Sequence, residues 1–134
     1  MNDTTDTRQQ ILEAAMERIV HYGYSKTTMS EIAKECNMSA GNIYRFFASK
    51  LDIAEAIGRK FNSELYQTYA SICRKPITAA DRLRQFFEFS MVRTYEAREE
   101  KDKRVELAET LADERPLFMN EQLAQERVYL VQIL

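Results

Sequence analysis

Apolar residues recur along this chain at intervals of three and four positions, which is the spacing of one face of an α-helix. Within residues 7–22, for example, Ile11, Ala15 and Ile19 form one stripe, and a longer stripe repeats every fourth residue over residues 53–69. No segment shows the sustained alternation typical of a strand, and the 134 residues include only 3 glycines and 2 prolines. The pattern therefore predicts an all-α chain.

Two short helices are expected after the first one. Thr28 and Glu31 form the Thr-x-x-Glu capping pattern at the start of the second helix. Ser39 is expected to cap the third, over residues 40–47. Asn37 lies between them, and asparagine tolerates the left-handed backbone of a sharp bend. Two helices of about two turns joined by three or four residues predict a helix-turn-helix.

The remaining helices are predicted by further capping pairs and by the two prolines. Ser49 with Asp52 begins a long helix that ends before Pro76. We therefore predict a head over residues 1–48 and a helical body over residues 49–134. Later helices are expected from Thr78, near residues 104–113 and from Pro116, with Leu83, Phe86, Phe87, Met91, Val105, Ala108 and Leu111 facing inward.

The last predicted helix has no recognisable end. The chain stops after residues 128–134, where an apolar face is still in progress and neither a glycine nor a cap occurs. We expect this chain to be part of a longer protein. The weaker alternative is a natural terminus buried against a partner.

Composition and charge exclude several classes of protein. No apolar run approaches the ~20 residues of a membrane span, and the N-terminus does not resemble a signal peptide. Cys36 and Cys73 lack metal-ligand spacing and are expected to be reduced thiols of a cytoplasmic protein with no metal or other cofactor. The net charge is −2, yet residues 38–50 contain Arg45 and Lys50 and no acid, which is compatible with a DNA-binding surface.

The start of the third helix has the residues that a reader of the DNA major groove needs. The groove admits one helix, whose N-terminal residues meet the base edges. Ala40 and Gly41 allow close approach, and the amide of Asn42 can pair with adenine. Arg45, one turn later, can reach a guanine or a phosphate. These four residues are therefore candidate base contacts.

Four further residues are candidates for phosphate contacts. Thr28 and Ser39 offer hydroxyls and free backbone N–H groups at helix starts, where phosphates are commonly held. Tyr44 and Lys50 can each bind a phosphate oxygen, which orients a protein on DNA without reading its sequence. Considered alone, Tyr44 could equally be a core aromatic, and Asn42, Arg45 and Lys50 ordinary surface residues.

One ordered set of residues runs through the head and the start of the long helix: Ile11-Leu12-Glu13-Ala14-Ala15, Gly23, Thr27-Thr28, Ile32-Ala33, Ser39, Gly41, Ile43-Tyr44, Phe47 and Lys50. With this set, residues 8–57 resemble the DNA-binding domain of the tetracycline-repressor (TetR) family. Departures from the family pattern include Asn37 in place of a glycine and Leu51 in place of a glutamate. Asn42, Arg45 and Phe46 also differ, so the operator sequence cannot be taken from a relative.

The resemblance implies a fold and a function. It implies a three-helix, homeodomain-like head, a long linking fourth helix, and part of a helical ligand-binding and dimerisation bundle. It adds Ser30 to the candidate base contacts. It also implies a homodimer formed through C-terminal helices, bound to a palindromic operator in double-stranded DNA and released by a small-molecule inducer. Repression, rather than activation, rests on this resemblance alone.

Three alternative readings stay open at this point. Phe86, Phe87 and Tyr95 could line a ligand cavity, although aromatic residues at helical spacing are more often ordinary core. A helical interaction protein could keep the head without binding DNA. An enzyme is not expected, because His21 is the only histidine and has no nucleophile or carboxylate pair in a catalytic pattern with it.

Overall fold

The computed structural model describes residues 3–99 and 103–134, and all regular secondary structure within these residues is helical. The predicted all-α fold is thus confirmed. The helices are α1 (Asp3–Tyr22), α2 (Met29–Glu35), α3 (Ala40–Ile43), α4 (Lys50–Cys73), α5 (Ala79–Glu99), α6 (Arg104–Glu114) and α7 (Pro116–Ile133).

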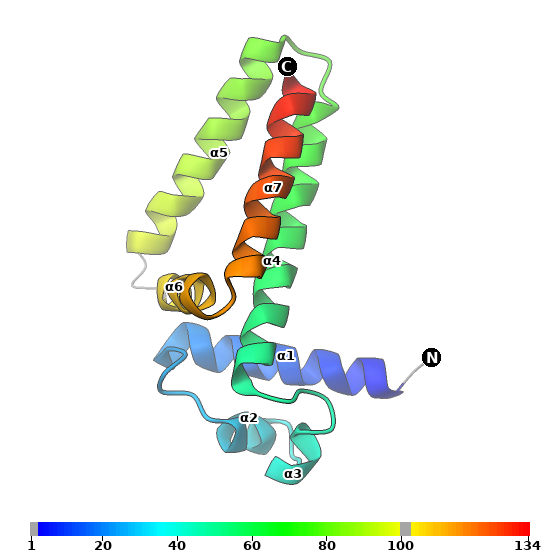
Figure 1. Cartoon of the computed structure of the whole chain (residues 1–134), viewed down its shortest axis with the longest axis vertical. Helices are drawn as coiled ribbons and strands as arrows, with labels where there is room; N and C mark the ends of the chain where they lie inside the picture. The colour runs from blue at the N-terminus through cyan, green and yellow to red at the C-terminus, as the bar shows by residue number, and fades with distance from the viewer. Residues whose placement is uncertain (1–2, 100–102) are drawn as a thin grey trace.

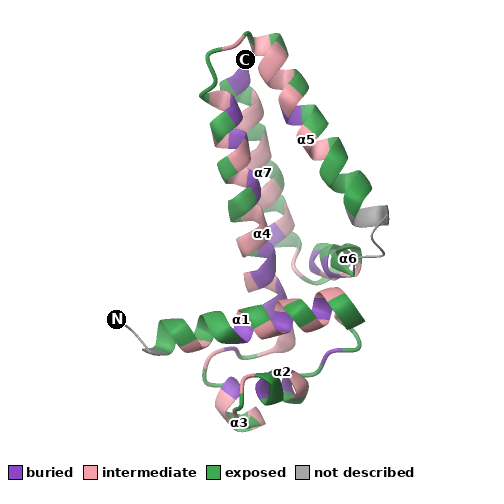
Figure 2. Cartoon of the chain, turned by 180° about the vertical axis from the view of Figure 1, so that it is seen from behind, coloured by how far each residue is buried: buried purple, intermediate pink, exposed green. Residues whose placement is uncertain are grey.

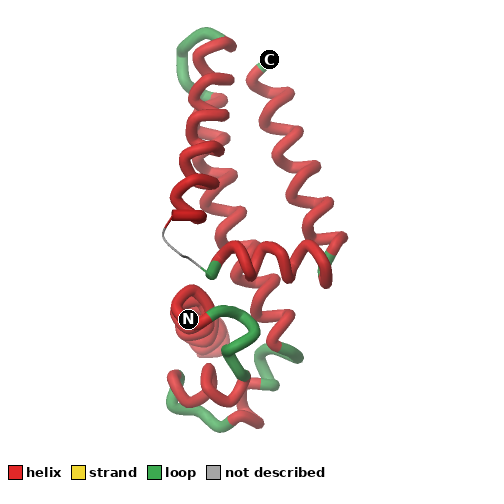
Figure 3. Tube along the Cα trace, turned by 90° about the vertical axis from the view of Figure 1, so that its left-hand side faces the viewer, coloured by secondary structure: helices red, strands yellow, loops and turns green. Residues whose placement is uncertain are grey.

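The molecule has a small head at one end and three long helices at the other (Figure 1). In the head, α1 crosses the first turns of α4, while α2 and α3 lie on the far side of α1. Helix α4 runs from the head to the opposite end, and α5 and α7 lie beside it. Helix α6 lies across the molecule, between the head and the C-terminal end of α5. The tube in Figure 3 shows the same arrangement from the side.

The predicted caps of α2, α3 and α4 are confirmed. The Thr28 hydroxyl accepts the N–H of Glu31 while the Glu31 carboxylate accepts the N–H of Thr28, which completes a capping box. The hydroxyls of Ser39 and Ser49 cap α3 and α4 in the same way. Asn37 has a φ of 55°, so it takes the left-handed conformation expected at the turn between α2 and α3.

Two predicted helix boundaries were wrong. Helix α1 begins at Asp3 rather than near Thr7, and α3 ends at Ile43 rather than near Phe47. After Ile43 the chain tightens into turns, with N–H groups of Arg45 and Phe46 bonded three residues back. The guanidinium of Arg8 donates to the Phe46 carbonyl at 3.1 Å. This bond stabilises the segment that follows the end of α3.

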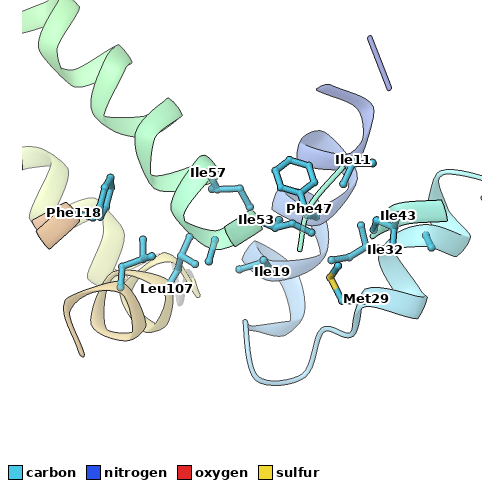
Figure 4. Packing of buried hydrophobic residues seen from close by; sticks show 14 residues of the cluster. Ile11, Ile19, Met29, Ile32, Ile43, Phe47, Ile53, Ile57, Leu107 and Phe118 are labelled. Atoms are coloured by element: carbon cyan, nitrogen blue, oxygen red, sulfur yellow. The ribbon is translucent and has the colours of Figure 1, made fainter. Parts of the chain in front are cut away.

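The core of the head continues into the body. Figure 4 shows Ile11 and Ile19 of α1, Ile32 of α2, Ile43 of α3 and Ile53 of α4 pointing toward one another. The same cluster includes three buried residues of α6 and α7, and a Cβ on Gly58 would lie 2.9 Å from two of them, so α4 passes close to α6 and α7 here. These three residues are Leu107, Leu111 and Phe118.

A second core lies in the body, where Tyr69 of α4 stacks on Phe86 of α5 with ring centres 4.1 Å apart. The prediction that Phe87 and Met91 face inward was wrong, since these side chains are 52% and 70% exposed. Helix α5 packs on one side only, and Figure 2 shows exposed residues over the half of it that leads toward α6. The predicted burial of Val105 and Ala108 in α6 was also wrong, because both residues are exposed. Leu107 and Leu111 are the buried pair of this helix.

Candidate nucleic-acid interface

The N-terminal end of α3 is unobstructed. A Cβ added to Gly41 would meet no heavy atom within 4 Å, and Gly41 itself is exposed. The Ser39 hydroxyl accepts the N–H of Asn42 at 3.1 Å, which holds the first turn in shape. Ala40 is half-buried beside it. The surface of α3 is therefore open at Gly41.

The two polar side chains predicted to read bases are neighbours. Arg45 is exposed and donates from Nη1 to the Asn42 Oδ1 at 3.5 Å, a long hydrogen bond. Asn42 is half-buried, and its side-chain amide carries the donor Nδ2 beside this acceptor Oδ1. The structure thus places these two residues together, one turn apart, next to Gly41.

Three of the candidate phosphate contacts and one further candidate base contact are exposed side chains of the head. Tyr44 is 53% exposed, which is not the environment of a core aromatic. Thr28 and Ser39 are exposed at the starts of α2 and α3, and Ser30 is exposed in the first turn of α2. All four side chains are open to a ligand at the surface of the head.

Lys50 has a more restrained position than a free surface cation. Its Nζ donates to the carbonyl oxygen of Tyr24 at 2.9 Å and lies 4.1 Å from the centre of the Tyr24 ring. A lysine ammonium has three protons, so the bond to Tyr24 leaves others for a phosphate. Lys50 is also the first residue of α4, where the helix dipole favours an anion.

The acids of α2 are engaged by a cation of α1. Arg18 bonds to Glu35 at 2.9 Å and lies 3.6 Å from Glu31. The pKa of Glu31 is lowered from its ordinary value, chiefly by the hydrogen bond from the Thr28 backbone N–H and further by the charge of Arg18, while burial opposes the shift. These carboxylates are held by Arg18 and by the α2 cap, and the segment from residue 38 to 50 has no acid.

Sequence reasoning missed two residues of the head. The Arg8 guanidinium lies 4.1 Å from the centre of the Phe47 ring and supports the segment between α3 and α4. Tyr24 holds Lys50. Both contacts join residues from different elements, and the sequence pattern carries no signal for such pairs.

The structure places the predicted ligand-binding aromatics in different surroundings. Phe86 is buried in the core of the body, while Phe87 and Tyr95 are 52% and 61% exposed. A groove of about 520 Å³ lies between α4 and α7, lined in part by Tyr66 and Tyr129. A second hollow, of about 870 Å³, follows α1 and is bordered by Phe61 and Arg104 among others. No helix among the described residues is long and apolar enough to cross a membrane.

Comparison with known proteins supports the family resemblance in the head. Residues 11–57 match the sequence model described as "Bacterial regulatory proteins, tetR family". Over 51 residues the chain is 43% identical to an uncharacterized HTH-type transcriptional regulator, YvkB, of Bacillus subtilis, a match that covers 38% of this chain and 27% of that relative. The alignment thus spans about a quarter of that relative's length.

Solved structures extend the likeness to the body. The ketosteroid transcriptional regulator KstR2 of Mycobacterium tuberculosis is 25% identical, with a TM-score of 0.70 over 94% of this chain and 65% of that one. Thermus thermophilus FadR, a TetR-family repressor solved with lauroyl-CoA, shares the fold at 23% identity, with a TM-score of 0.68 over 94% of this chain and 64% of that one. The head thus matches the tetR family of bacterial regulatory proteins over residues 11–57, and the fold of head and body is similar to that of the regulator KstR2.

Proposed function

We propose that this chain is part of a sequence-specific DNA-binding transcription regulator, acting most simply as a repressor. The observation that carries the proposal is the open N-terminal end of α3, where Gly41 is unobstructed and the side chains of Ser39 and Arg45 are exposed. A helix end of this kind fits the major groove of B-DNA, which admits a single helix. The alternative of a helical interaction protein is not favoured, because the matched proteins are named as regulators.

Base reading would fall to residues of α3 and of the first turn of α2. The Asn42 amide suits adenine N6 and N7, and the Arg45 guanidinium suits guanine O6 and N7. Ala40 and Gly41 would allow close approach, and Ser30 would add a hydroxyl from α2. The exposure of Ser30, Gly41 and Arg45 supports this assignment.

Phosphate contacts would fix the head on the duplex. Thr28 and Ser39 offer hydroxyls at helix starts, and the exposed Tyr44 offers a phenol. Lys50 would provide the charge, held in place by Tyr24. Such contacts orient a protein without reading sequence.

The wider activity is also part of the proposal. We expect a homodimer formed through C-terminal helices, with α3 helices about 34–36 Å apart on a palindromic operator. We retain a head of residues 1–48, a body of residues 49–134, a cytoplasmic location and the absence of enzymatic activity. Thermus thermophilus FadR is described in complex with lauroyl-CoA, which supports a small-molecule effector here without fixing its class.

A pair of single-atom changes tests the proposal. Tyr44→Phe removes only the hydroxyl that would bind a phosphate. Tyr22→Phe is the matched control, since Tyr22 is 49% exposed against 53% for Tyr44 but lies at the end of α1. We expect Tyr44→Phe alone to weaken binding of duplex DNA several-fold in fluorescence anisotropy, since a neutral hydrogen bond is worth about 1 kcal/mol. Absence of salt-sensitive binding by the unmodified, folded chain would contradict the proposal.

A further inference from the structure

Arg8 of α1 contacts the end of the segment that carries the candidate base contacts. Its Nη1 donates to the carbonyl oxygen of Phe46 at 3.1 Å, and its guanidinium carbon lies 4.1 Å from the centre of the Phe47 ring. Arg8 and Phe46 are 38 positions apart along the chain. Arg8 therefore joins the first helix of the head to the turns that follow α3.

The ring that Arg8 contacts is buried in the core of the head. Phe47 is 3% exposed and belongs to the same cluster as Ile11 of α1 and Ile53 of α4, and Figure 4 shows it beside both residues. Arg8 lies one turn before Ile11, on the same side of α1, and it is exposed. An arginine in such a position keeps its apolar stem against the core and its charged group in solvent.

Helix α3 is too short to fix its own direction. It has four residues, Ala40–Ile43, and an isolated helix of this length is not stable in water. Its direction therefore depends on contacts at its two ends. Before its start, the N–H of Met38 bonds to the carbonyl of Ala33 in α2 at 3.0 Å. After its end, the chain is held by Phe47 in the core and by the bond from Arg8 to Phe46.

Backbone hydrogen bonds connect the position of Phe46 to the candidate base contacts. The N–H groups of Phe46 and Phe47 bond to the Ile43 carbonyl at 3.0 and 3.1 Å. The N–H of Arg45 bonds to the Asn42 carbonyl at 3.1 Å. Because these bonds overlap along the chain, a displacement of Phe46 would also displace Asn42 and Arg45.

We propose that Arg8 is a positioning residue for sequence-specific DNA binding, which sets the direction of α3 by holding the turns after it against α1. The inference rests on the proposed function, because it concerns the helix to which base reading is assigned. Arg8 acts on the base contacts through Phe46 and Phe47 and does not itself bind the duplex. Its loss should therefore lower the preference for the selected sequence and leave the general attraction to DNA unchanged.

The first test needs no DNA. In the full chain, Arg8→Met keeps an apolar stem beside Phe47 without the donors, whereas Arg8→Lys keeps a charge and a donor without the planar group. Arg127→Met is the control, since it removes one exposed cation from α7. We expect Arg8→Met to shift the backbone amide resonances of residues 40–47, Arg8→Lys to shift them less, and Arg127→Met to leave them in place. Unchanged resonances at residues 40–43 in Arg8→Met would overturn the proposal.

The second test measures binding to the duplex that the unmodified chain selects and to a duplex of unrelated sequence, over a series of salt concentrations. We expect Arg8→Met to bind the selected duplex about tenfold more weakly, the loss that corresponds to one hydrogen bond to a charged group. Arg8→Lys should recover part of this loss. For the unrelated duplex, Arg8→Met and Arg127→Met should bind equally well. The slope of log K against log salt should not change, since it counts phosphate contacts.

Each remaining outcome decides between the possible roles of Arg8. A salt slope lower by about one unit in Arg8→Met would overturn the proposal, because Arg8 would then bind a phosphate itself. Equal affinity of Arg8→Met and the unmodified chain for the selected duplex would overturn it as well. If the unmodified chain selects no duplex, the proposed function fails, while the resonances still decide whether Arg8 positions α3. If Arg8→Met does not fold, Arg8→Lys supplies both measurements.

Discussion

The ammonium nitrogen of Lys50 lies 2.9 Å from the carbonyl oxygen of Tyr24 and 4.1 Å from the centre of the Tyr24 ring. This contact joins the first residue of α4 to the loop before α2, so it spans the whole helix-turn-helix. A lysine held by a carbonyl and an aromatic face loses much of its conformational freedom. The cation proposed to bind a phosphate is therefore held in one place before DNA arrives.

Replacement of Lys50 by alanine removes this charge. If Lys50 binds one phosphate, Lys50→Ala should weaken binding to all duplex sequences by a similar factor and lower the slope of log K against log salt by about one unit. Fluorescence anisotropy over a series of salt concentrations measures both quantities. Arg127→Ala is the control, because it removes one exposed cation from α7. An unchanged salt slope in Lys50→Ala would remove Lys50 from the phosphate contacts.

Asn42 is expected to read one base pair in each half-site. Asn42→Ala should cost roughly 1–3 kcal/mol at that pair and relax the preference there, because an amide can pair with adenine at two positions. Bound duplexes are selected from a random pool with the variant and with the unmodified chain, and the two consensus sequences are compared. Asn120→Ala is a control at an exposed position of α7. The assignment is wrong if the variant selects the same consensus as the unmodified chain.

The local elements of this fold could be predicted because their signals lie within a few residues. Thr28 with Glu31, and Ser49 with Asp52, predicted two helix starts correctly, since each cap bonds within its own first turn. Asn37 at the bend was predicted for the same reason.

The faces of the outer helices could not be predicted in this way. Which side of α5 is buried depends on where α4 and α7 lie, so Phe86 was placed correctly and Phe87 was not. Contacts over long separations were missed altogether: Lys50 meets Tyr24 across 26 positions, and Glu106 meets Ser25 across 81. Periodicity within one helix carries no information about such partners.

The left-handed backbone at Asn37 gives a prediction about stability. Alanine avoids this conformation by about 1–2 kcal/mol, whereas glycine adopts it freely. Asn37→Ala should therefore lower the free energy of unfolding by about 1 kcal/mol, and Asn37→Gly should leave it equal or higher. Urea denaturation measures both variants. Equal stability of Asn37→Ala and the unmodified chain would show that the turn does not need this residue.

Glu31 gives a prediction about pH. Its pKa is lowered in the folded chain, chiefly by the Thr28 backbone N–H. A carboxyl of this kind contributes stability that is fully present above its unfolded pKa, about 4.3, and is lost as the pH falls through the lower folded value. The unmodified chain should therefore exceed Glu31→Gln in stability near neutral pH, and the difference should shrink on acidification.

Thermal unfolding at a series of pH values checks this expectation. Glu109→Gln, at an exposed position of α6, serves as the control for the loss of one negative charge. A difference between Glu31→Gln and the unmodified chain that stays constant from neutral pH down to the acid limit of folding would contradict the assigned role of the capping box.

The central claim is that the edge of α3 reads DNA sequence, and selection of bound duplexes from a random pool at near-physiological salt tests it most directly. The account predicts enrichment of a palindromic consensus with half-sites about one helical turn apart, as for other helix-turn-helix dimers. Recovery of no enriched sequence from a folded, dimeric preparation would contradict it and would favour a helical interaction protein instead.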